Sequence, residues 1–166
     1  MTIEERAKEI LLSCPEFCET PTSISGKYHH GETHLIHAEE TANAMRHLCA
    51  EFNVPKQDRD LLIGACYLHD IGLRIITQKG KTIRPNYDYY EATGYSRDRT
   101  YYDIHAMLSA QIVDMYEIER KEELKRLVSV HMSHWHPKCP QPGNLYEYLM
   151  CVADYVVTYG TMEKYK

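Results

Sequence analysis

Residues 62–72 read Leu62-Ile63-Gly64-Ala65-Cys66-Tyr67-Leu68-His69-Asp70-Ile71-Gly72, and this stretch decides the fold of the chain. One helical face of this stretch carries Leu62, Ala65, Cys66 and His69, which are at positions i, i+3, i+4 and i+7. Gly72 is the residue type that commonly ends a helix. Burying an imidazole beside the Asp70 carboxylate costs several kcal/mol unless a partner is present, and a metal cation would serve both groups. Two residues make a weak motif, so the pair alone fits a core histidine beside a surface aspartate better.

Hydrophobic periodicity along the rest of the chain predicts an all-α fold with very little β-structure. Apolar residues recur at helical spacing in six segments, separated by stretches that contain Pro, Gly, Ser and Thr. The predicted helices cover approximately residues 3–14, 33–52, 55–70, 103–116, 119–131 and 144–159. Pro15 and Pro21 lie between the first two of these segments, so residues 15–32 are expected to form a loop.

Length and charge limit the classes of function. The chain has 166 residues, which predicts one domain over residues 1–166 with its core at about 33–160. Its formal net charge of −5 gives no basic footprint for nucleic acid. No apolar run approaches the ~20 residues that span a bilayer, and the first residues lack the apolar region of a signal peptide. We therefore expect a cytoplasmic protein with no membrane or nucleic-acid partner.

The six cysteines do not form the C-x2-C pairs of a zinc site. Several lie on apolar stripes, where cysteine behaves as a small hydrophobic residue. Cys14 and Cys18 are at helical spacing and could ligate an ion, but packing in the core is the simpler interpretation. Reduced thiols agree with the expected cytoplasmic location.

Six polar residues lie on or against apolar helical faces at separate places in the chain. They are His37, His69, Asp70, His105, His131 and Asp154. Each one alone fits a hydrogen-bonded core residue. Together, four histidines and two aspartates buried without a cation would carry a large desolvation cost. Convergence on a metal in the centre of a helical bundle avoids that cost.

Residues 71–101 have no helical period and combine many tyrosines with an excess of basic side chains. The basic residues are Arg74, Lys79, Lys81, Arg84, Arg97 and Arg99. Residues 74–77 and 82–84 are expected to pair as a small hairpin around Gly80. The segment follows Asp70 and precedes His105, so we expect it to cover the metal site with basic side chains facing an anion. The alternative is a mobile, solvated loop.

The order and setting of the six residues resemble the HD-domain superfamily of metal-dependent phosphohydrolases, over about residues 33–158. The matching pieces are His37 before Ala38-Glu39-Glu40-Thr41-Ala42, Leu68-His69-Asp70-Ile71-Gly72, His105 before Ser109-Ala110, His131 after an apolar helix, and Ala153-Asp154-Tyr155. The resemblance implies a helical bundle with a five-helix core, to which this chain adds an N-terminal helix and the long irregular insertion at 71–101.

The resemblance also implies a ligand set for one or two divalent ions, such as Fe, Mn, Zn, Co or Ni. His37, His69, Asp70 and Asp154 would hold the first ion. His105 and His131 resemble the set for a second ion, with Asp70 bridging. His134 is an alternative to His131, but the helical register of His131 points inward.

The reaction expected from this resemblance is hydrolysis of a nucleotide or another small phosphate ester by metal-activated water, with His69 and Asp70 as catalytic residues. Many relatives have lysine after the glycine of the motif, where this chain has Leu73 and then Arg74. The expected substrate-binding residues are Arg74, Arg97, Arg99 and His134.

Two other functions remain open at this point, as does the oligomeric state, for which a homo-oligomer is one possibility. One is a mixed-valent di-iron oxygenase of the same superfamily, for which Tyr28 and Glu32 would serve as gating residues. The other is a regulatory module without catalysis. The intact set of six ligand-type residues favours an enzyme.

Overall fold

The computed structural model describes residues 1–22, 32–75, 77–78, 81–82, 105–137 and 139–164. Its helices are α1 (Ile3–Leu12), α2 (Pro15–Cys18), α3 (His34–Glu51), α4 (Lys56–Leu68), the 3-10 helix η1 (Ile71–Ile75), α6 (His105–Asp114), α7 (Lys121–Val130) and α8 (Leu145–Lys164). The strands are β1 (Thr77–Gln78) and β2 (Lys81–Thr82), which pair antiparallel. The prediction of an all-α fold is confirmed.

Local sequence signals explain where the helices begin. Thr2 forms a capping box with Glu5 at the start of α1, and the Thr33 hydroxyl accepts a hydrogen bond from the Ile36 amide at the start of α3. The loop predicted for residues 15–32 is wrong in its first part, because α2 begins there with Pro15 in the first turn. The predicted hairpin is confirmed where Thr77 lies opposite Thr82, but Arg74 and Ile75 belong to η1 rather than to a strand, and residues 83–84 lie outside the described part of the chain.

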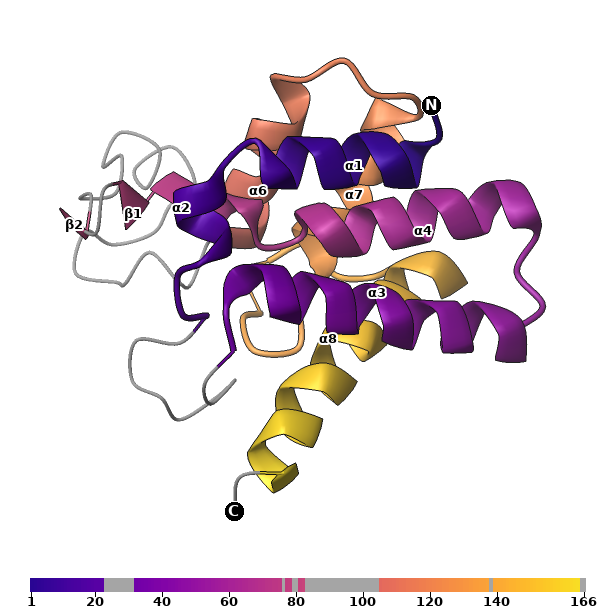
Figure 1. The fold of residues 1–166 in the computed structure, drawn as a ribbon. Coiled ribbons are helices and arrows are strands. Elements are labelled where there is room, and N and C mark those ends of the chain that lie inside the picture. The colour runs from indigo at the N-terminus through magenta and orange to yellow at the C-terminus, as the bar shows by residue number, and fades with distance from the viewer. Residues whose placement is uncertain (23–31, 76, 79–80, 83–104, 138, 165–166) are drawn as a thin grey trace.

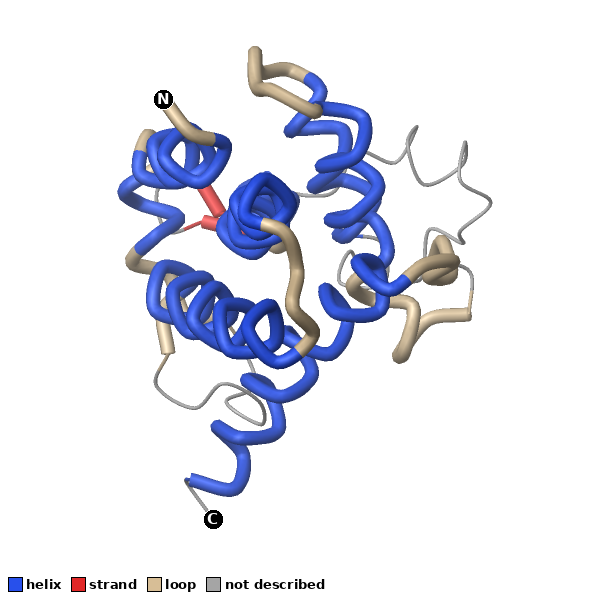
Figure 2. Tube along the Cα trace, turned by 90° about the vertical axis from the view of Figure 1, so that its right-hand side faces the viewer, coloured by secondary structure: helices blue, strands red, loops and turns tan. Residues whose placement is uncertain are grey.

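Helix α4 is the centre of the bundle. It contacts α1, α3, α7 and α8, and Figure 2 shows it end-on with the other helices around it. The eight consecutive residues 61–68 are all buried, so this half of the helix has no solvent-facing side. The sequence predicted a single buried face, but a helix surrounded by others is buried all round. The C-terminal end of α4 therefore opens directly into the core, and His69 is the residue at that end.

Gly72 does not end a helix as predicted. The chain continues from α4 into η1, and Gly72 packs against the first turn of α6. A Cβ atom at this position would lie 2.4 Å from the His105 carbonyl oxygen and 2.6 Å from the Ser109 amide nitrogen. The Ser109 hydroxyl accepts a hydrogen bond from the Gly72 amide at 2.8 Å and donates one to the His105 carbonyl at 2.9 Å. Gly72 is thus required for close contact between η1 and α6.

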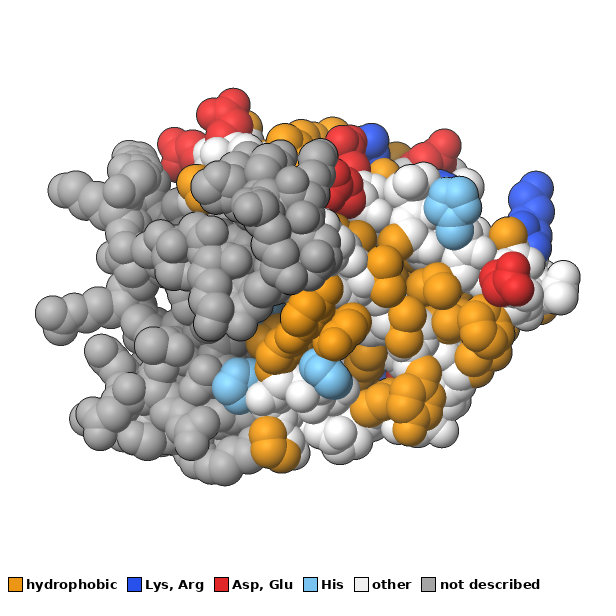
Figure 3. Space-filling model, turned by 90° about the horizontal axis from the view of Figure 1, so that it is seen from below, with side chains coloured by type: hydrophobic (Ala, Val, Ile, Leu, Met, Phe, Trp, Pro, Cys, Tyr) orange, Lys and Arg blue, Asp and Glu red, His pale blue; other side chains and the backbone are white. Residues whose placement is uncertain are grey.

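The surface of α8 carries an apolar stripe. Its exposed members are Leu145, Tyr148, Val152 and Val156. α8 forms the lower side of the molecule in Figure 1, and the view from below in Figure 3 shows apolar side chains gathered on that face. The predicted homo-oligomer stays a prediction.

Two remaining expectations concern the state of the cysteines and the presence of membrane-spanning helices. All six cysteines are free thiols, and five of them are buried. No helix in the described part of the chain is both long enough and apolar enough to cross a membrane.

Candidate metal centre

The six residues singled out in the sequence come from five parts of the fold and meet at the C-terminal end of α4. His37 lies in the first turns of α3, His69 caps α4, His105 begins α6, His131 caps α7 and Asp154 lies within α8. Asp70 follows His69. Five of these side chains are at most 6% exposed, whereas Asp70 keeps 16% of its side chain exposed. The site is therefore open to solvent mainly at Asp70.

One half of the site is formed by α3, α4 and α8. The Nε2 atoms of His37 and His69 are 3.0 Å apart. Asp154 Oδ1 lies 3.1 Å from the first and 3.5 Å from the second. Asp70 Oδ2 completes the group at 3.5 Å from His37 Nε2 and 3.4 Å from His69 Nε2.

The other half is formed by α6 and α7. The Nε2 atoms of His105 and His131 are 2.9 Å apart. Asp70 Oδ1 lies 3.0 Å from His105 Nε2 and 3.4 Å from His131 Nε2. The two oxygens of one carboxylate thus face two separate pairs of histidines.

Backbone hydrogen bonds fix which ring nitrogens face the centre. His69 Nδ1 donates to the Cys66 carbonyl at 2.7 Å, and His131 Nδ1 donates to the Val128 carbonyl at 2.7 Å. In the neutral ring this leaves the Nε2 lone pair free to bind a cation. His69 faces His37 and His131 faces His105, with 3.0 and 2.9 Å between the Nε2 atoms, so a proton or a metal ion must lie between the two nitrogens of each pair. The donor set therefore fits divalent cations bound by imidazole and carboxylate.

The charges of the site also favour a bound cation. Burial alone would raise the pKa values of Asp70 and Asp154. The neighbouring histidines have a larger, opposite effect and hold both pKa values well below the ordinary value for aspartate. Burial opposes protonation of His69, yet the Asp70 and Asp154 carboxylates raise its pKa to about 9. Burial lowers the pKa of His131. A metal ligand must be deprotonated, so a metal ion and a proton compete for His69.

Comparison with known families agrees with this geometry. The model of the HD domain matches residues 35–159, which is most of the chain. The chain belongs to the HD domain family. HD domains bind divalent metals and are typically metal-dependent phosphohydrolases. No curated protein and no solved structure matches the chain.

Three overlapping groups in this HD domain could each hold a metal ion. They are His37 with His69 and Asp70, His69 with His131 and Asp154, and Asp70 with His105 and His131. Within each group the ligand-type atoms lie within 4.8 Å of one another. The structure thus brings together all six residues proposed from the sequence, and His131 rather than His134 supplies an atom to the groups.

Of the other site residues proposed from the sequence, the structure describes His134, Arg74 and Glu32. His134 is exposed, and its ring contacts Tyr155 edge-on at 4.7 Å between centroids. Arg74 Nη1 donates to the Tyr116 hydroxyl at 2.8 Å and to Cys14 Sγ at 3.5 Å. Arg97, Arg99 and Tyr28 lie outside the described residues. Glu32 is buried, with Oε2 3.8 Å from His37 Nδ1.

Two features near the site were not identified from the sequence. One is the Gly72–Ser109 contact, which fixes the backbone of His105 and depends on the packing of η1 against α6. The other is His34, a buried residue three positions before His37. The i, i+3 spacing of these two histidines was the signal that would have placed them on the same side of one helix.

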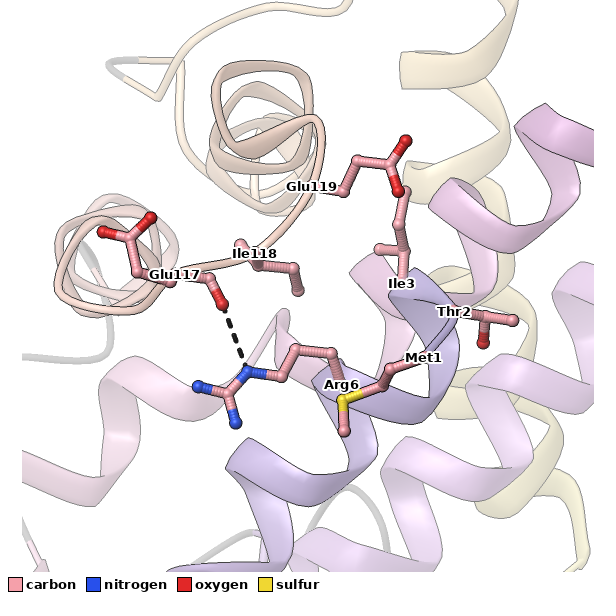
Figure 4. A pocket seen from close by; sticks show the side chains of 7 residues that line it. All are labelled: Met1, Thr2, Ile3, Arg6, Glu117, Ile118 and Glu119. Carbon is pink, nitrogen blue, oxygen red and sulfur yellow. Dashed lines mark hydrogen bonds between the residues drawn. The ribbon is translucent and has the colours of Figure 1, made fainter.

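A surface pocket lies at the opposite end of α4. It is lined by Met1, Thr2, Ile3, Arg6, Glu117, Ile118 and Glu119 (Figure 4). Arg6 Nε donates to the Glu117 carbonyl oxygen at 3.1 Å across it. The pocket contains none of the residues of the metal centre, and its one basic side chain already has an acceptor.

Proposed function

We propose that this HD domain is a metal-dependent phosphohydrolase that hydrolyses a nucleotide or another small phosphate ester. The observation that carries the proposal is the position of Asp70, whose two oxygens face two different pairs of histidines. This arrangement suits a carboxylate that bridges two cations. Such metal pairs are typical of enzymes that hydrolyse phosphate esters.

The residues divide naturally between the two ions. His37, His69 and Asp154 would hold one, His105 and His131 the other, and Asp70 both. Bound divalent ions would supply a water of lowered pKa and neutralise charge on a phosphoryl oxygen. The protein holds the rings of His69 and His131 through Nδ1 bonds to backbone carbonyls, and it excludes bulk water by burying all ligands except Asp70. We propose that the substrate reaches the centre at Asp70, with His134, Arg97 and Arg99 binding its charged groups.

The experiment that tests this function is a phosphate-ester panel. Protein loaded with Mn²⁺ without oxygen should release phosphate or a nucleoside from at least one member, because hydrolysis needs the metal only as a Lewis acid. Asp70→Ala, prepared in the same way, is the matched control and should be inactive. Absence of turnover over nucleoside mono-, di- and triphosphates and small sugar phosphates would contradict the proposal.

A di-iron oxygenase is the second candidate, and the position of Glu32 is the observation in its favour. This carboxylate is buried beside His37, where it could act on the ligand ring as the gating residue proposed for that class. An oxygenase needs iron that changes its oxidation state. Turnover that appears only with iron and O₂, with consumption of oxygen, would therefore replace the hydrolase by this function.

A regulatory module is the third candidate. It would bind metal without turning over any ester, and it would not need both oxygens of Asp70 to face histidines. Metal analysis of protein from its native host, with iron separated from manganese and zinc, shows whether the iron that an oxygenase needs is present, and its absence would exclude that class.

A further inference from the structure

His34 is a buried histidine beside the metal centre that the six-residue ligand set does not use. It is the first residue of α3, three positions before His37, and only 5% of it is exposed. Its Nδ1 atom is buried and has no hydrogen-bond partner among the described residues. Leaving a buried polar group without a hydrogen bond is unfavourable, so this nitrogen calls for an explanation.

The ring of His34 is held in place from two sides. It stacks on Phe17 of α2 with 4.2 Å between centroids and 16° between planes. Its backbone amide donates to the Thr20 carbonyl at 3.0 Å, which ties the start of α3 to the end of α2. A phenylalanine or leucine would satisfy this packing without an unsatisfied nitrogen. Packing alone therefore does not account for the imidazole.

The charge state of His34 follows from its surroundings. Burial lowers its pKa to about 3, and the nearby Asp70 carboxylate only partly opposes this, while His37, His105 and His69 add to it. Cations bound in the centre would lower the pKa further, so the ring is neutral in either case. A neutral imidazole has one N–H to donate and one lone pair to accept with. The geometric link to the metal centre is the i, i+3 spacing of His34 and His37, which places both rings on the same side of α3.

The start of α3 also favours a particular kind of ligand. The N-terminal end of an α-helix carries partial positive charge, and α3 is 18 residues long. An anion beside His34 would thus be favoured by the helix and by the cations, while the ring would supply a directed hydrogen bond. A phosphate group meets all three conditions.

We propose that His34 binds the substrate directly, with its ring Nδ1–H donating a hydrogen bond to a phosphate oxygen of a ligand at the metal centre. The identity of the ligand as a phosphate ester rests on the proposed function. His34 would then orient the phosphate relative to the metal ligands, and Phe17 would act as a positioning residue for the ring.

The experiment measures the affinity of inorganic phosphate for Mn²⁺-loaded protein by calorimetry, together with metal content and Tm. His34→Phe retains the stacking ring but has no nitrogen, and it should weaken phosphate binding about tenfold with unchanged metal content. His34→Asn places an amide nitrogen near the position of Nδ1 and should retain most of the affinity. His34→Gln places it near Nε2 instead and should behave like His34→Phe.

Phe17→Leu is the control for packing, because it removes the stacking partner and leaves the imidazole. It should weaken phosphate binding less than His34→Phe. Unchanged affinity in His34→Phe would overturn the inference, as would equal losses in the Asn and Gln variants. The comparison of Asn with Gln decides the question even if the Phe variant does not fold.

This test is independent of turnover. Wild-type protein that binds phosphate through His34 but hydrolyses no ester would overturn the proposed function and leave the inference standing. Ester hydrolysis with the same KM in wild type and His34→Phe would overturn the inference alone. Wild-type protein that does not bind phosphate would also overturn it.

Discussion

Acidic residues lie at both ends of α4, but they face different kinds of polar group. At the N-terminal end, Asp60 accepts hydrogen bonds from the amides of Ile3 at 2.8 Å and Glu4 at 3.0 Å. Nearby, Asp58 accepts from Arg120 Nη1 at 2.7 Å and from the Tyr146 hydroxyl at 2.8 Å. Each carboxylate oxygen at this end has a donor that the protein itself supplies.

At the C-terminal end, the oxygens of Asp70 face histidine ring nitrogens. In His69 and His131 the other nitrogen already donates to a backbone carbonyl, so Nε2 is an acceptor in the neutral ring. Acceptors that converge on acceptors require a proton or a metal cation between them. The comparison shows that burial does not distinguish a structural carboxylate from a metal ligand. The groups that the carboxylate faces do.

Asp70→Ala should have the largest effect at the functional end. Removing the carboxylate that faces both halves should abolish binding of both metals and reduce turnover by at least about 10²–10³-fold. Metal content by mass spectrometry and ester hydrolysis measure the two losses. Metal content equal to wild type would contradict the assignment of Asp70 as the bridge.

His105→Ala should divide the centre. The ring lies only on the α6–α7 side, so the ion held by His37, His69 and Asp154 should remain while the other is lost. The expected metal content is about one ion per chain, with activity strongly reduced. Retention of two ions would show that His105 is not a ligand, and loss of both would show that the halves are not separable.

Gly72→Ala tests the support of the site. The added methyl group would overlap the backbone of α6, so the variant should lose about 1–3 kcal/mol of unfolding free energy and bind metal at His105 more weakly. Denaturant unfolding and metal titration measure these effects. Gly160→Ala is the control, because nothing lies within 4 Å of its Cβ position and a helical alanine should be neutral or stabilising.

Asp60→Ala should have the smallest effect and should be confined to stability. It removes the acceptors for two amides at the start of α1, which is expected to cost about 1 kcal/mol of unfolding free energy. Metal content and activity should stay at the wild-type level. A loss of metal in this variant would break the distinction between the two ends of α4.

The sequence was sufficient to predict most of the helices and the residues of the centre. The spacing of apolar residues predicts the helical faces, and each polar residue that interrupts such a face can be identified from the sequence. His69 and His131 each end such a series, and the structure places each as the cap of its helix. The short α2 was missed because four residues are too few to show a period.

What only the tertiary structure decided is which atoms face one another. The two oxygens of Asp70 separate the histidines of α3 and α4 from those of α6 and α7, and Gly72 is required because α6 packs on η1. His34 is buried on Phe17, and its Nδ1 has no hydrogen-bond partner in the part of the chain that the structure describes. These contacts join segments distant in the chain, so no local pattern contains them. Periodicity is set by neighbouring residues, whereas contact geometry is set by how whole helices pack.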